Sequence, residues 1–484
     1  MNVLEQLQPK AVFSYFEALC GIPHGSGNMG EISRYCVEFA RKHGLEYYQD
    51  AAHNVIIVKP ATAGYEDAPA VMIQGHLDMV CAKEVSLTEL DMATTPLELA
   101  VEGDYIYAKG TSLGGDDGIA IAYTLAILES QNLQHPRIEA VFTTDEEVGM
   151  LGAAAIDLSP LKAKMLLNID SEEEGIFLAS CAGGVTAVCS LPVTLEESRG
   201  TVMELSVSGL QGGHSGVQID KGLGNANMLM GRLLNRLAKR ADYQIAALKG
   251  GTKDNAIPLL CQATIVTSDP HIVKEVVREY DTILKSELKT SDPGVTVKAA
   301  EKTEKKVPAL NGDCTKRAVC LLLNVPNGIQ SMSMDIKGLV ETSLNLGIIA
   351  LEQNVLRMSF AVRSSVRTAK EAVVERLQNI TQALGGTTTL SGDYPAWEYK
   401  AESRLRKVVV EAYRDQYGEE PLIQAVHAGL ECGILSGKID DLDCISLGPN
   451  MTGAHTCHEK LSISSTIRTW KLIVEVLKRL KDLS

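Results

Sequence analysis

Short apolar segments typical of β-strands alternate with helical segments over the first 180 residues. The strand-like runs, rich in Val, Ile and Leu, are Asn54–Lys59, Ala70–Ile73, Ile138–Thr143 and Met165–Ile169. The helical runs, with apolar residues at helical spacing or throughout, are Ala11–Cys20, Glu31–Lys42 and Gly118–Leu128. Apolar strands separated by helices are typical of parallel sheets covered by helices. The sequence therefore predicts an α/β fold with a mostly parallel mixed sheet and helices on both faces.

The last ninety residues resume this alternation, whereas the middle of the chain differs. The resumed elements, two helices and two strands, are Arg404–Tyr417, Leu422–Val426, Leu442–Leu447 and Ser465–Leu483. In the middle, Thr201–Ser208 alternates apolar and polar residues, the pattern of a half-buried strand. A chain of 484 residues also exceeds the size of one ordinary core. We predict one domain formed by residues 1–183 and 395–484, and an inserted α+β domain of residues 184–394.

The inserted domain contains a weak internal repeat. Asn255–Ser268 followed by Ile272–Leu284 has the same pattern as Ser343–Ser364 followed by Lys370–Leu384. Each half is predicted to be strand, turn, strand and helix. The match is one of pattern more than identity, so internal duplication is a hypothesis at this point.

Composition excludes several classes of partner. The formal net charge is −15, which disfavours binding to nucleic acid or to an anionic membrane. No apolar run reaches the roughly 18 residues that a membrane-spanning helix needs. The eleven cysteines are odd in number and include no Cys-x-x-Cys pair, which favours reduced thiols over disulfides. The start of the chain has no basic segment followed by a long apolar core, as a signal peptide would. We therefore expect a cytoplasmic protein.

Histidine and acidic residues follow, or lie beside, the predicted strands of the α/β part. Ligands bind at the carboxyl ends of the strands in open α/β sheets, so these side chains are expected to meet. Asp145, Glu146 and Glu147 are three adjacent carboxylates whose mutual repulsion requires a compensating positive charge, and a metal would supply it. The predicted metal ligands are His76, Asp116, Glu147, Asp170 and His455.

The number of candidate ligands indicates more than one metal ion. Five ligands exceed what one tetrahedral zinc ion needs, whereas two metals sharing a bridging carboxylate would use them all. Asp78 lies on the same side of an extended chain as His76 and can accept the other imidazole N–H. Glu146 points away from Glu147 in an extended segment, so it is free to act as a general base. Taken singly, the His-x-Asp and Glu-Glu motifs are more often solvated loop, Asp116 could be a helix N-cap, and His455 would more often be a satisfied polar histidine than a ligand.

Seven segments in this order resemble the M20 family of zinc peptidases, and within it the aminoacyl-histidine dipeptidase branch. They are QGHLDMV, GTSLGGDDGIA, TTDEEVGMLGA, NIDSEEEG, GGHSG, HAGLECG and GAH. The resemblance extends nearly from end to end of the chain. It implies hydrolysis of unblocked dipeptides, including Xaa-His and β-alanyl-histidine, by a homodimer with two Zn²⁺ per subunit. Co²⁺ or Mn²⁺ would be substitutes.

The resemblance also implies roles for the metal ligands. His76 and Asp170 would bind one metal, Glu147 and His455 the other, and Asp116 would bridge them. Asp78 would orient His76, and Glu146 would be the general base and proton shuttle. The chain departs from the branch at Asp117, where Asn is common, and at Thr456-Cys457-His458, where Ser-Pro-Asp is common. His458 is thus an alternative ligand, although the family position favours His455.

By the same resemblance the inserted domain is a lid that completes the substrate site. His214 in GGHSG would stabilise the oxyanion of the tetrahedral intermediate. Asn255 and Arg363 are candidates for binding the substrate carboxylate, and Glu431 for binding its free α-amino group. A polar turn for His214 and a salt bridge for Arg363 remain the alternatives.

Two other functions compete with a dipeptidase. An aminoacylase or deacetylase of the same superfamily would use the same metals and need no acceptor for a substrate amine. A non-catalytic metal-binding protein is the third possibility, and the intact Glu146–Glu147 pair argues against it.

Overall fold

The computed structural model describes residues 3–303 and 306–483, which form two compact units. Unit 1 consists of the chain up to Ser180, of Tyr399–Ala425 and of the chain from Leu430 onward. Unit 2 consists of Cys181–Glu398 and Val426–Gly429. The sequence prediction places its boundaries after residues 183 and 394, and it assigns the four residues Val426–Gly429 to the first domain instead.

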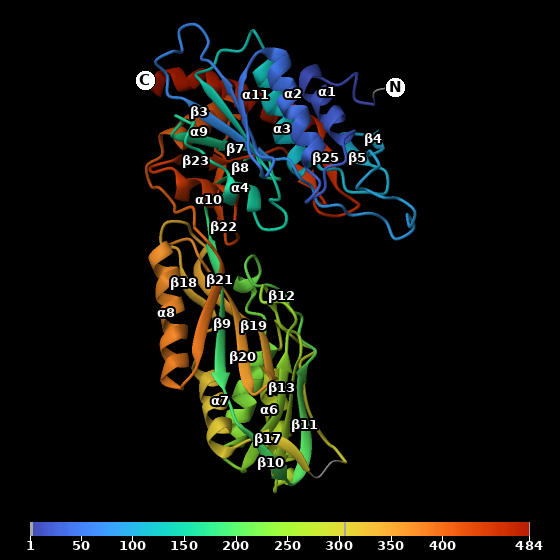
Figure 1. Ribbon diagram of the computed structural model, residues 1–484, viewed down its shortest axis with the longest axis vertical. Helices are drawn as coiled ribbons and strands as arrows, with labels where there is room; N and C mark the ends of the chain where they lie inside the picture. The colour runs from blue at the N-terminus through green and yellow to red at the C-terminus, as the bar shows by residue number, and fades with distance from the viewer. Residues whose placement is uncertain (1–2, 304–305, 484) are drawn as a thin grey trace. The chain divides into compact units, whose positions relative to one another are not determined.

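Unit 1 is built on an eight-stranded mixed sheet (Figure 1). The four central strands, β6, β3, β7 and β23, are mutually parallel, whereas the neighbouring strands on either side run antiparallel to them. The α/β prediction is confirmed, and the parallel core of the sheet is formed by these four central strands. The strands, in their order across the sheet, are β1 (Glu46–Gln49), β2 (Val55–Lys59), β6 (Ile138–Thr143), β3 (Val71–His76), β7 (Met165–Asn168), β23 (Asp443–Ser446), β8 (Ile176–Cys181) and β22 (Leu422–Val426).

Helices and a small second sheet complete unit 1. The helices are α1 (Lys10–Cys20), α2 (Gly30–His43), α3 (Gly115–Glu129), α4 (Leu151–Ala155), α9 (Arg404–Tyr417), α10 (Glu431–Lys438) and α11 (Ile463–Arg479), followed by the short η2 (Leu480–Leu483). The small sheet has the order β24 (Met451–Thr452), β25 (Lys460–Ser462), β5 (Tyr105–Ala108) and β4 (Leu99–Glu102).

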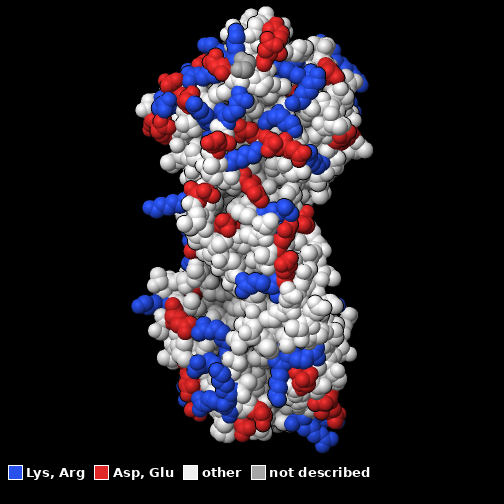
Figure 2. All heavy atoms as spheres, turned by 90° about the vertical axis from the view of Figure 1, so that its left-hand side faces the viewer, with Lys and Arg blue, Asp and Glu red and all other residues white. Residues whose placement is uncertain are grey.

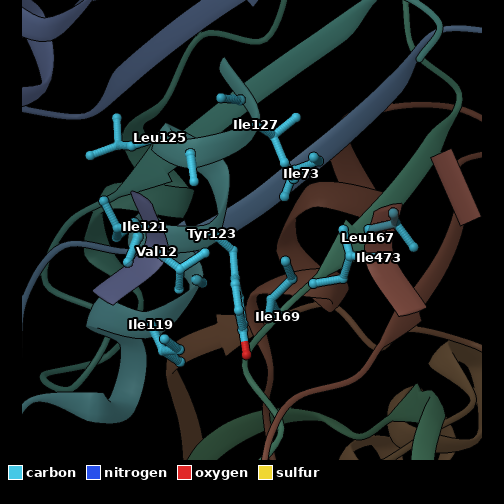
Figure 3. Packing of buried hydrophobic residues seen from close by; sticks show 14 of the residues in the cluster. Val12, Ile73, Ile119, Ile121, Tyr123, Leu125, Ile127, Leu167, Ile169 and Ile473 are labelled. Carbon is cyan, nitrogen blue, oxygen red and sulfur yellow. The ribbon is translucent and has the colours of Figure 1, made fainter. Parts of the chain in front are cut away.

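Helix α3 is apolar all round because it is buried on nearly every side. Figure 3 shows its side chains, Ile119 to Ile127, among Val12 of α1, Ile73 of β3 and residues of β7 and α11. The Tyr123 hydroxyl donates a hydrogen bond to the Thr466 carbonyl at 2.8 Å, so its one polar atom is satisfied. This packing fixes the start of α3 against the carboxyl end of β3.

Unit 2 contains a nine-stranded sheet in which neighbouring strands are all antiparallel. Strand β11 alternates buried and half-buried residues, as its sequence pattern predicts. The sheet elements are β9 (Gly183–Pro192), β11 (Thr201–Ser208), β13 (Tyr243–Gly250), β15 (Cys261–Thr267), β16 (Thr296–Glu301), β18 (Gly328–Met332), β19 (Val340–Glu352), β20 (Val355–Ser364) and β21 (Thr387–Tyr394). The remaining elements are β10 (Leu195–Arg199), β12 (Gly213–His214), η1 (Ile219–Lys221), α5 (Ala226–Leu237), β14 (Ala256–Ile257), α6 (Pro270–Glu287), β17 (Lys306–Leu310), α7 (Gly312–Asn324) and α8 (Arg367–Ala383).

Eight of the nine strands in the sheet of unit 2, all except β18, form two groups of four with equivalent connections. The first group runs β11, α5, β13, β15, α6, β16, and the second runs β9, α7, β19, β20, α8, β21. If the strands of each group are numbered in chain order, both groups have the order 4-1-3-2 across the sheet. The two groups join where β13 pairs with β19. This equivalence supports an internal duplication, which we propose. In this duplication, β13 is the equivalent of β19. The sequence pattern instead placed that equivalent strand near Asn255, downstream of β13, where only the short β14 forms.

Charged side chains of both signs lie on the surface, and the described helices are too short or too polar to cross a membrane. Acidic and basic side chains are interspersed over the face that Figure 2 shows. Within residues 3–303 and 306–483, no helix combines the length and the apolar character needed to cross a membrane.

Candidate metal centre

The five predicted metal ligands come from strand ends and adjoining loops of unit 1. His76 is the last residue of β3, Glu147 lies in the loop after β6, and Asp170 follows β7 by two residues. These three strands are parallel neighbours, so their carboxyl ends lie at one edge of the sheet. Asp116 lies at the start of α3, and His455 lies in the loop between β24 and β25. The structure brings all five together.

The ligands form two groups that share Asp116. One group is His76, Asp116 and Asp170, and the other is Asp116, Glu147 and His455. In each group, one ligand atom per residue lies within 4.8 Å of the others. A third group joins His76 with Glu146 and Glu147.

The Asp116 carboxylate lies between the two imidazoles. Its Oδ1 is 3.0 Å from His76 Nε2, and its Oδ2 is 3.0 Å from His455 Nε2. The backbone of Asp116 and Asp117 is not helical, although both residues lie within the bounds of α3. One carboxylate that presents each oxygen to a different imidazole has the arrangement of a bridging ligand.

The chemistry of these side chains fits divalent cations. Glu147 Oε1 is buried and has no hydrogen bond of acceptable geometry, although His455 Nε2 is only 2.9 Å away. Imidazole nitrogens and carboxylate oxygens are the ligands that Zn²⁺ prefers besides thiolates, and they also suit other divalent first-row metals. The residues present therefore fit a metal centre.

Protonated imidazoles balance the carboxylates when no metal is bound. Burial alone would lower the pKa of His76, but Asp116, Asp170 and Asp78 outweigh it and hold that pKa well above its ordinary value. The hydrogen bond to Asp116 and the negative charge of nearby Glu147 raise the pKa of His455 to about 11. Burial raises the pKa of Asp170 to about 6 even though His76 opposes it. Protonated imidazoles thus supply positive charge to the site, and bound cations would supply that charge in their place.

Glu146 lies beside this cluster and has an unusually high proton affinity. Burial raises its pKa to about 9, and the neighbouring carboxylates of Asp170, Glu431 and Glu147 add to the shift against the opposing effect of His76. A nearby cation stabilises an ionised carboxylate, so a metal-loaded centre would shift this pKa back down. A carboxyl group with such a tunable pKa can both accept and deliver a proton.

Asp78 is buried, and it contacts both the His76 ring and the backbone of Glu146 and Glu147. Its backbone carbonyl lies 2.9 Å from His76 Nδ1, whereas its carboxylate Oδ1 is 3.6 Å from that nitrogen. The carboxylate instead accepts hydrogen bonds from the Ser26 hydroxyl at 2.8 Å and from the Glu146 and Glu147 amides at 3.0 and 3.4 Å. The carbonyl of Asp78 thus faces the His76 ring as second-sphere partners do, and its carboxylate positions the segment that carries Glu146.

His214 belongs to unit 2, where β12 and β14 pair. Its Nδ1 accepts hydrogen bonds from the Gly216 and Val217 amides, each at 3.2 Å. The hydrogen of the neutral ring therefore lies on Nε2, which is left to donate. Burial lowers the pKa of His214, and the positive charge of Arg363 lowers it further. A neutral imidazole with a free N–H donor can stabilise an oxyanion.

Arg363 and Asn255 also lie in unit 2. The Arg363 Nη1 donates to the Tyr394 hydroxyl at 2.9 Å, and its Nε is buried without a partner. No ion pair of Arg363 with Asp or Glu is found within the described part of the chain, so the salt-bridge alternative has no partner there. The side chain of Asn255 is exposed, and its backbone carbonyl accepts the Ser215 amide at 2.9 Å.

Glu431 is fully buried at the start of α10 in unit 1. Its Oε2 accepts hydrogen bonds from Gln74 Nε2 at 2.5 Å and from the Thr143 hydroxyl at 2.6 Å. Gln74 Oε1 in turn accepts the Asn168 side-chain amide at 2.7 Å. This network gives Oε2 a positioning role, whereas Oε1 is buried without a hydrogen-bond partner and is the oxygen left for the predicted contact with a substrate amine.

Sequence reasoning missed this network and the residue Glu459. Gln74 and Asn168 each stand two positions before a predicted metal ligand, within strands that are otherwise mostly apolar. A polar residue in a buried strand needs a hydrogen-bond partner, and this signal could have identified both. Glu459 offered no comparable signal because it follows a loop.

Comparison with known proteins identifies relatives over the whole length. Residues 72–479 match the model of peptidase family M20/M25/M40. The chain is 36% identical over 484 residues to the cytosol non-specific dipeptidase of Escherichia coli (strain K12), covering 99% of each chain. Its structure is similar to an aminoacylhistidine dipeptidase from Vibrio alginolyticus, with TM-score 0.92, 34% identity, and coverage of 98% and 97%.

A more distant match shares the fold alone. Aminopeptidase PepT from Bacillus cereus has TM-score 0.55 and 15% identity, with coverage of 98% of this chain and 99% of that one. The predicted resemblance and the predicted enzyme class, a hydrolase of peptide bonds, are confirmed by the family match and the full-length relatives. The chain therefore belongs to peptidase family M20/M25/M40.

Proposed function

We propose that this protein is a metal-dependent dipeptidase that hydrolyses unblocked dipeptides, including Xaa-His and β-alanyl-histidine. The observation that carries the proposal is the Asp116 carboxylate, which offers one oxygen to each of two ligand groups. The names of the two full-length relatives, a cytosol non-specific dipeptidase and an aminoacylhistidine dipeptidase, support the substrate class. We further propose a cytoplasmic homodimer with unit 2 as its lid.

Two divalent cations, Zn²⁺ with Co²⁺ or Mn²⁺ as substitutes, are the cofactors that we propose. His76 and Asp170 would hold one, Glu147 and His455 the other, and Asp116 both. When bound, such cations supply Lewis-acid chemistry that lowers the pKa of water and polarises a peptide carbonyl. Asp78 fixes the His76 ring through its carbonyl and leaves Nε2 free for coordination.

Glu146 is the proposed general base. Its carboxylate accepts a proton from the attacking water and then delivers that proton to the leaving amine as the C–N bond breaks. The amide hydrogen bond from Glu146 to Asp78 Oδ1 holds the residue beside the ligands. The segment is also tied to the N-terminal loop, because the Gly27 amide donates to Asp145 Oδ1 at 2.7 Å.

The residues of unit 2 are assigned to the substrate. His214 would donate its Nε2–H to the oxyanion of the tetrahedral intermediate, a role that its tautomer supports. Arg363, with its unpartnered Nε, and Asn255 would bind the substrate carboxylate. A guanidinium suits this task because its planar fork matches a carboxylate.

The first test replaces Glu146 by Gln, which keeps the volume and removes the base. Turnover of Ala-His should fall by about 10²–10⁴-fold while zinc content is retained. The exposed Glu89→Gln, which removes the same charge from unit 1, is the matched control and should keep wild-type turnover. Near-normal hydrolysis by Glu146→Gln would reject the base assignment.

The second test separates the dipeptidase from an aminoacylase. Ala-His and β-Ala-His are compared with their N-acetylated forms on the wild-type enzyme. A dipeptidase should hydrolyse the free forms and fail on the blocked ones. Preference for the acetylated substrates would establish the aminoacylase alternative, and inactivity of zinc-loaded protein on both sets would favour the non-catalytic one.

A further inference from the structure

Glu459 is a buried carboxylate that is held by backbone amides, and only 3% of its surface is exposed. Its Oε2 accepts the amides of Leu113 and Gly114 at 2.8 and 3.1 Å. Its Oε1 accepts the amides of Gly115 and Asp116 at 2.7 and 3.3 Å. These donors are consecutive residues at the start of α3, where the helix dipole also favours a negative charge.

The two glycines of this segment allow the backbone to wrap around the carboxylate. Gly114 has φ of 68°, a left-handed conformation that favours glycine. A Cβ at Gly115 would lie 2.8 Å from Met451 Sδ and 3.2 Å from Glu459 Oε1. The segment is therefore shaped for this carboxylate and leaves no room for a larger residue.

Glu459 connects the elements that carry two of the proposed metal ligands. The fourth amide of the set is that of Asp116 itself. At the other end, Glu459 immediately precedes β25 and lies four residues after His455, in the loop between β24 and β25. Because β24 pairs with β25 at Met451 and Leu461, this loop is closed at its base.

We infer that Glu459 is a positioning residue that holds Asp116 and His455 in register for the cation that they would share. The inference rests on the proposed metal centre. Asp116 Oδ2 and His455 Nε2 are 3.0 Å apart, and their residues are 339 positions apart in the chain. The four amide hydrogen bonds of Glu459 are a direct link between the two loops.

A merely structural cap for α3 would have different consequences. Loss of a cap lowers the stability of the fold but leaves the ligands of the folded protein in place. Loss of a positioning group lowers metal affinity in the folded protein, typically by 10–100-fold for groups that support metal ligands. Metal affinity therefore distinguishes the two roles.

The decisive variant is Glu459→Gln, which keeps the volume but turns one oxygen into an NH₂ group that cannot accept an amide hydrogen. Hydrogen exchange of residues 113–116 in the metal-free protein should accelerate, since two of the four amides lose their acceptor. In competition with a chromophoric chelator, one of the two zinc equivalents should bind about 10–100-fold more weakly, and the other, which would depend on Asp116 but not on His455, should weaken less. The control Glu89→Gln should match wild type in both measurements.

Gly115→Ala provides a second variant that keeps the charge of Glu459. Its added Cβ crowds Oε1, so the same zinc equivalent should weaken in the same direction. Turnover at limiting zinc should fall in both variants and recover at high zinc with KM unchanged. If Glu459→Gln fails to fold, the zinc affinity of Gly115→Ala tests the inference by itself.

Wild-type zinc affinity in the variants that fold would overturn the inference, as would unaltered exchange of residues 113–116 in Glu459→Gln. Absence of zinc binding by the wild-type protein would instead refute the proposed metal centre. In that case, the exchange measurement would still report on the contact between Glu459 and the start of α3.

Discussion

Single side chains in this protein take their chemical character from their neighbours. His427 in unit 2 illustrates this, because it is nearly buried and its Nε2 lies 2.7 Å from the Ser343 hydroxyl. Its Nδ1 is buried without a partner. Burial lowers its pKa to about 4, and the positive charge of Arg363 adds to the shift.

The depressed pKa of His427 predicts that unit 2 is sensitive to acid. In the unfolded chain His427 takes up a proton near pH 6.5, whereas the folded state resists it until about pH 4. The unfolded state thus binds more protons in this window, and stability falls as pH falls through it, by about 3 kcal/mol in total. Urea unfolding is followed by fluorescence of Trp397, the tryptophan of unit 2, in a Trp470→Phe background.

The variant His427→Gln should flatten this pH dependence between pH 6.5 and 4. A control, His271→Gln, changes an exposed histidine of the same unit and should keep the wild-type profile. An unchanged slope in His427→Gln would show that other groups cause the acid sensitivity.

Arg363 allows a prediction about substrate binding. Arg363→Met should raise KM for Ala-His by about 10–100-fold with little change in kcat, since a hydrogen bond to a charged group contributes roughly 1.5–3 kcal/mol. Arg363→Lys should recover only part of the loss, because ammonium lacks the bidentate fork.

Ala-His amide, which has no carboxylate, provides the cross-check for Arg363. Wild type and Arg363→Met should handle this substrate alike. A similar loss on the amide would assign Arg363 to structure, and equal KM values on Ala-His would remove it from the carboxylate site.

At the scale of elements, a buried polar network joins α10 to the three strands that lead to the proposed metal ligands. Gln74 of β3, Thr143 of β6, Asn168 of β7 and Glu431 of α10 are all fully buried. Gln74 lies two residues before His76, Asn168 lies two before Asp170, and Thr143 lies four before Glu147. These hydrogen bonds fix the ends of the three strands relative to one another. Side chains that follow different strands can share a metal only if those ends are aligned.

This network predicts opposite outcomes for two substitutions of Glu431. Glu431→Gln can keep its oxygen toward Gln74 and Thr143, so stability should change little. Glu431→Leu leaves both donors without an acceptor, at a cost of about 1–3 kcal/mol for each buried group. The measurement is urea unfolding of the metal-free protein, followed by Trp470 fluorescence in a Trp397→Phe background.

Zinc affinity should follow the same order, with Glu431→Leu weakened and Glu431→Gln close to wild type. The opposite pattern, with normal affinity in Glu431→Leu and a raised KM, would return Glu431 to the predicted role of binding the substrate amine.

The sequence patterns located most elements, and the failures have physical causes. Arg404–Tyr417 and Ile138–Thr143 have the predicted bounds, because amphipathic or continuous apolar runs with clear ends determine them locally. Strand β2 runs antiparallel to β6 and β8 runs antiparallel to β23, and the sequence did not predict these reversals because a strand pattern does not encode the direction of its neighbour. The strand expected around Asn255 shrinks to two residues, β14, which pairs with β12 outside the main sheet.

At the scale of the whole molecule, two units with separate cores should respond differently to metal. Unit 1 contains all five proposed ligands, and unit 2 contains none of them. Cations bound only to the folded state stabilise it by about 3 kcal/mol at 100 times Kd. Binding therefore stabilises unit 1 selectively.

Metal removal by a chelator should lower the thermal midpoint reported by Trp470 by roughly 5–10 °C. The midpoint reported by Trp397 should change much less. Each tryptophan is followed in a variant that lacks the other, and readdition of zinc is the control for reversibility. Equal shifts of both midpoints would show that the two units unfold together.

The amino-acid sequence by itself determined which side chains can gather at the site. Strand-like runs followed by His, Asp or Glu, separated by helices, bring their carboxyl ends to one edge of a sheet, so the meeting of His76, Glu147 and Asp170 follows from local pattern. Only the tertiary structure decided what supports those ligands. The contacts of Glu459 with α3 and of Glu431 with Gln74 join residues more than 340 positions apart. Local periodicity encodes the secondary structure and buried face of a segment, but the partner of a buried polar atom depends on how distant segments pack.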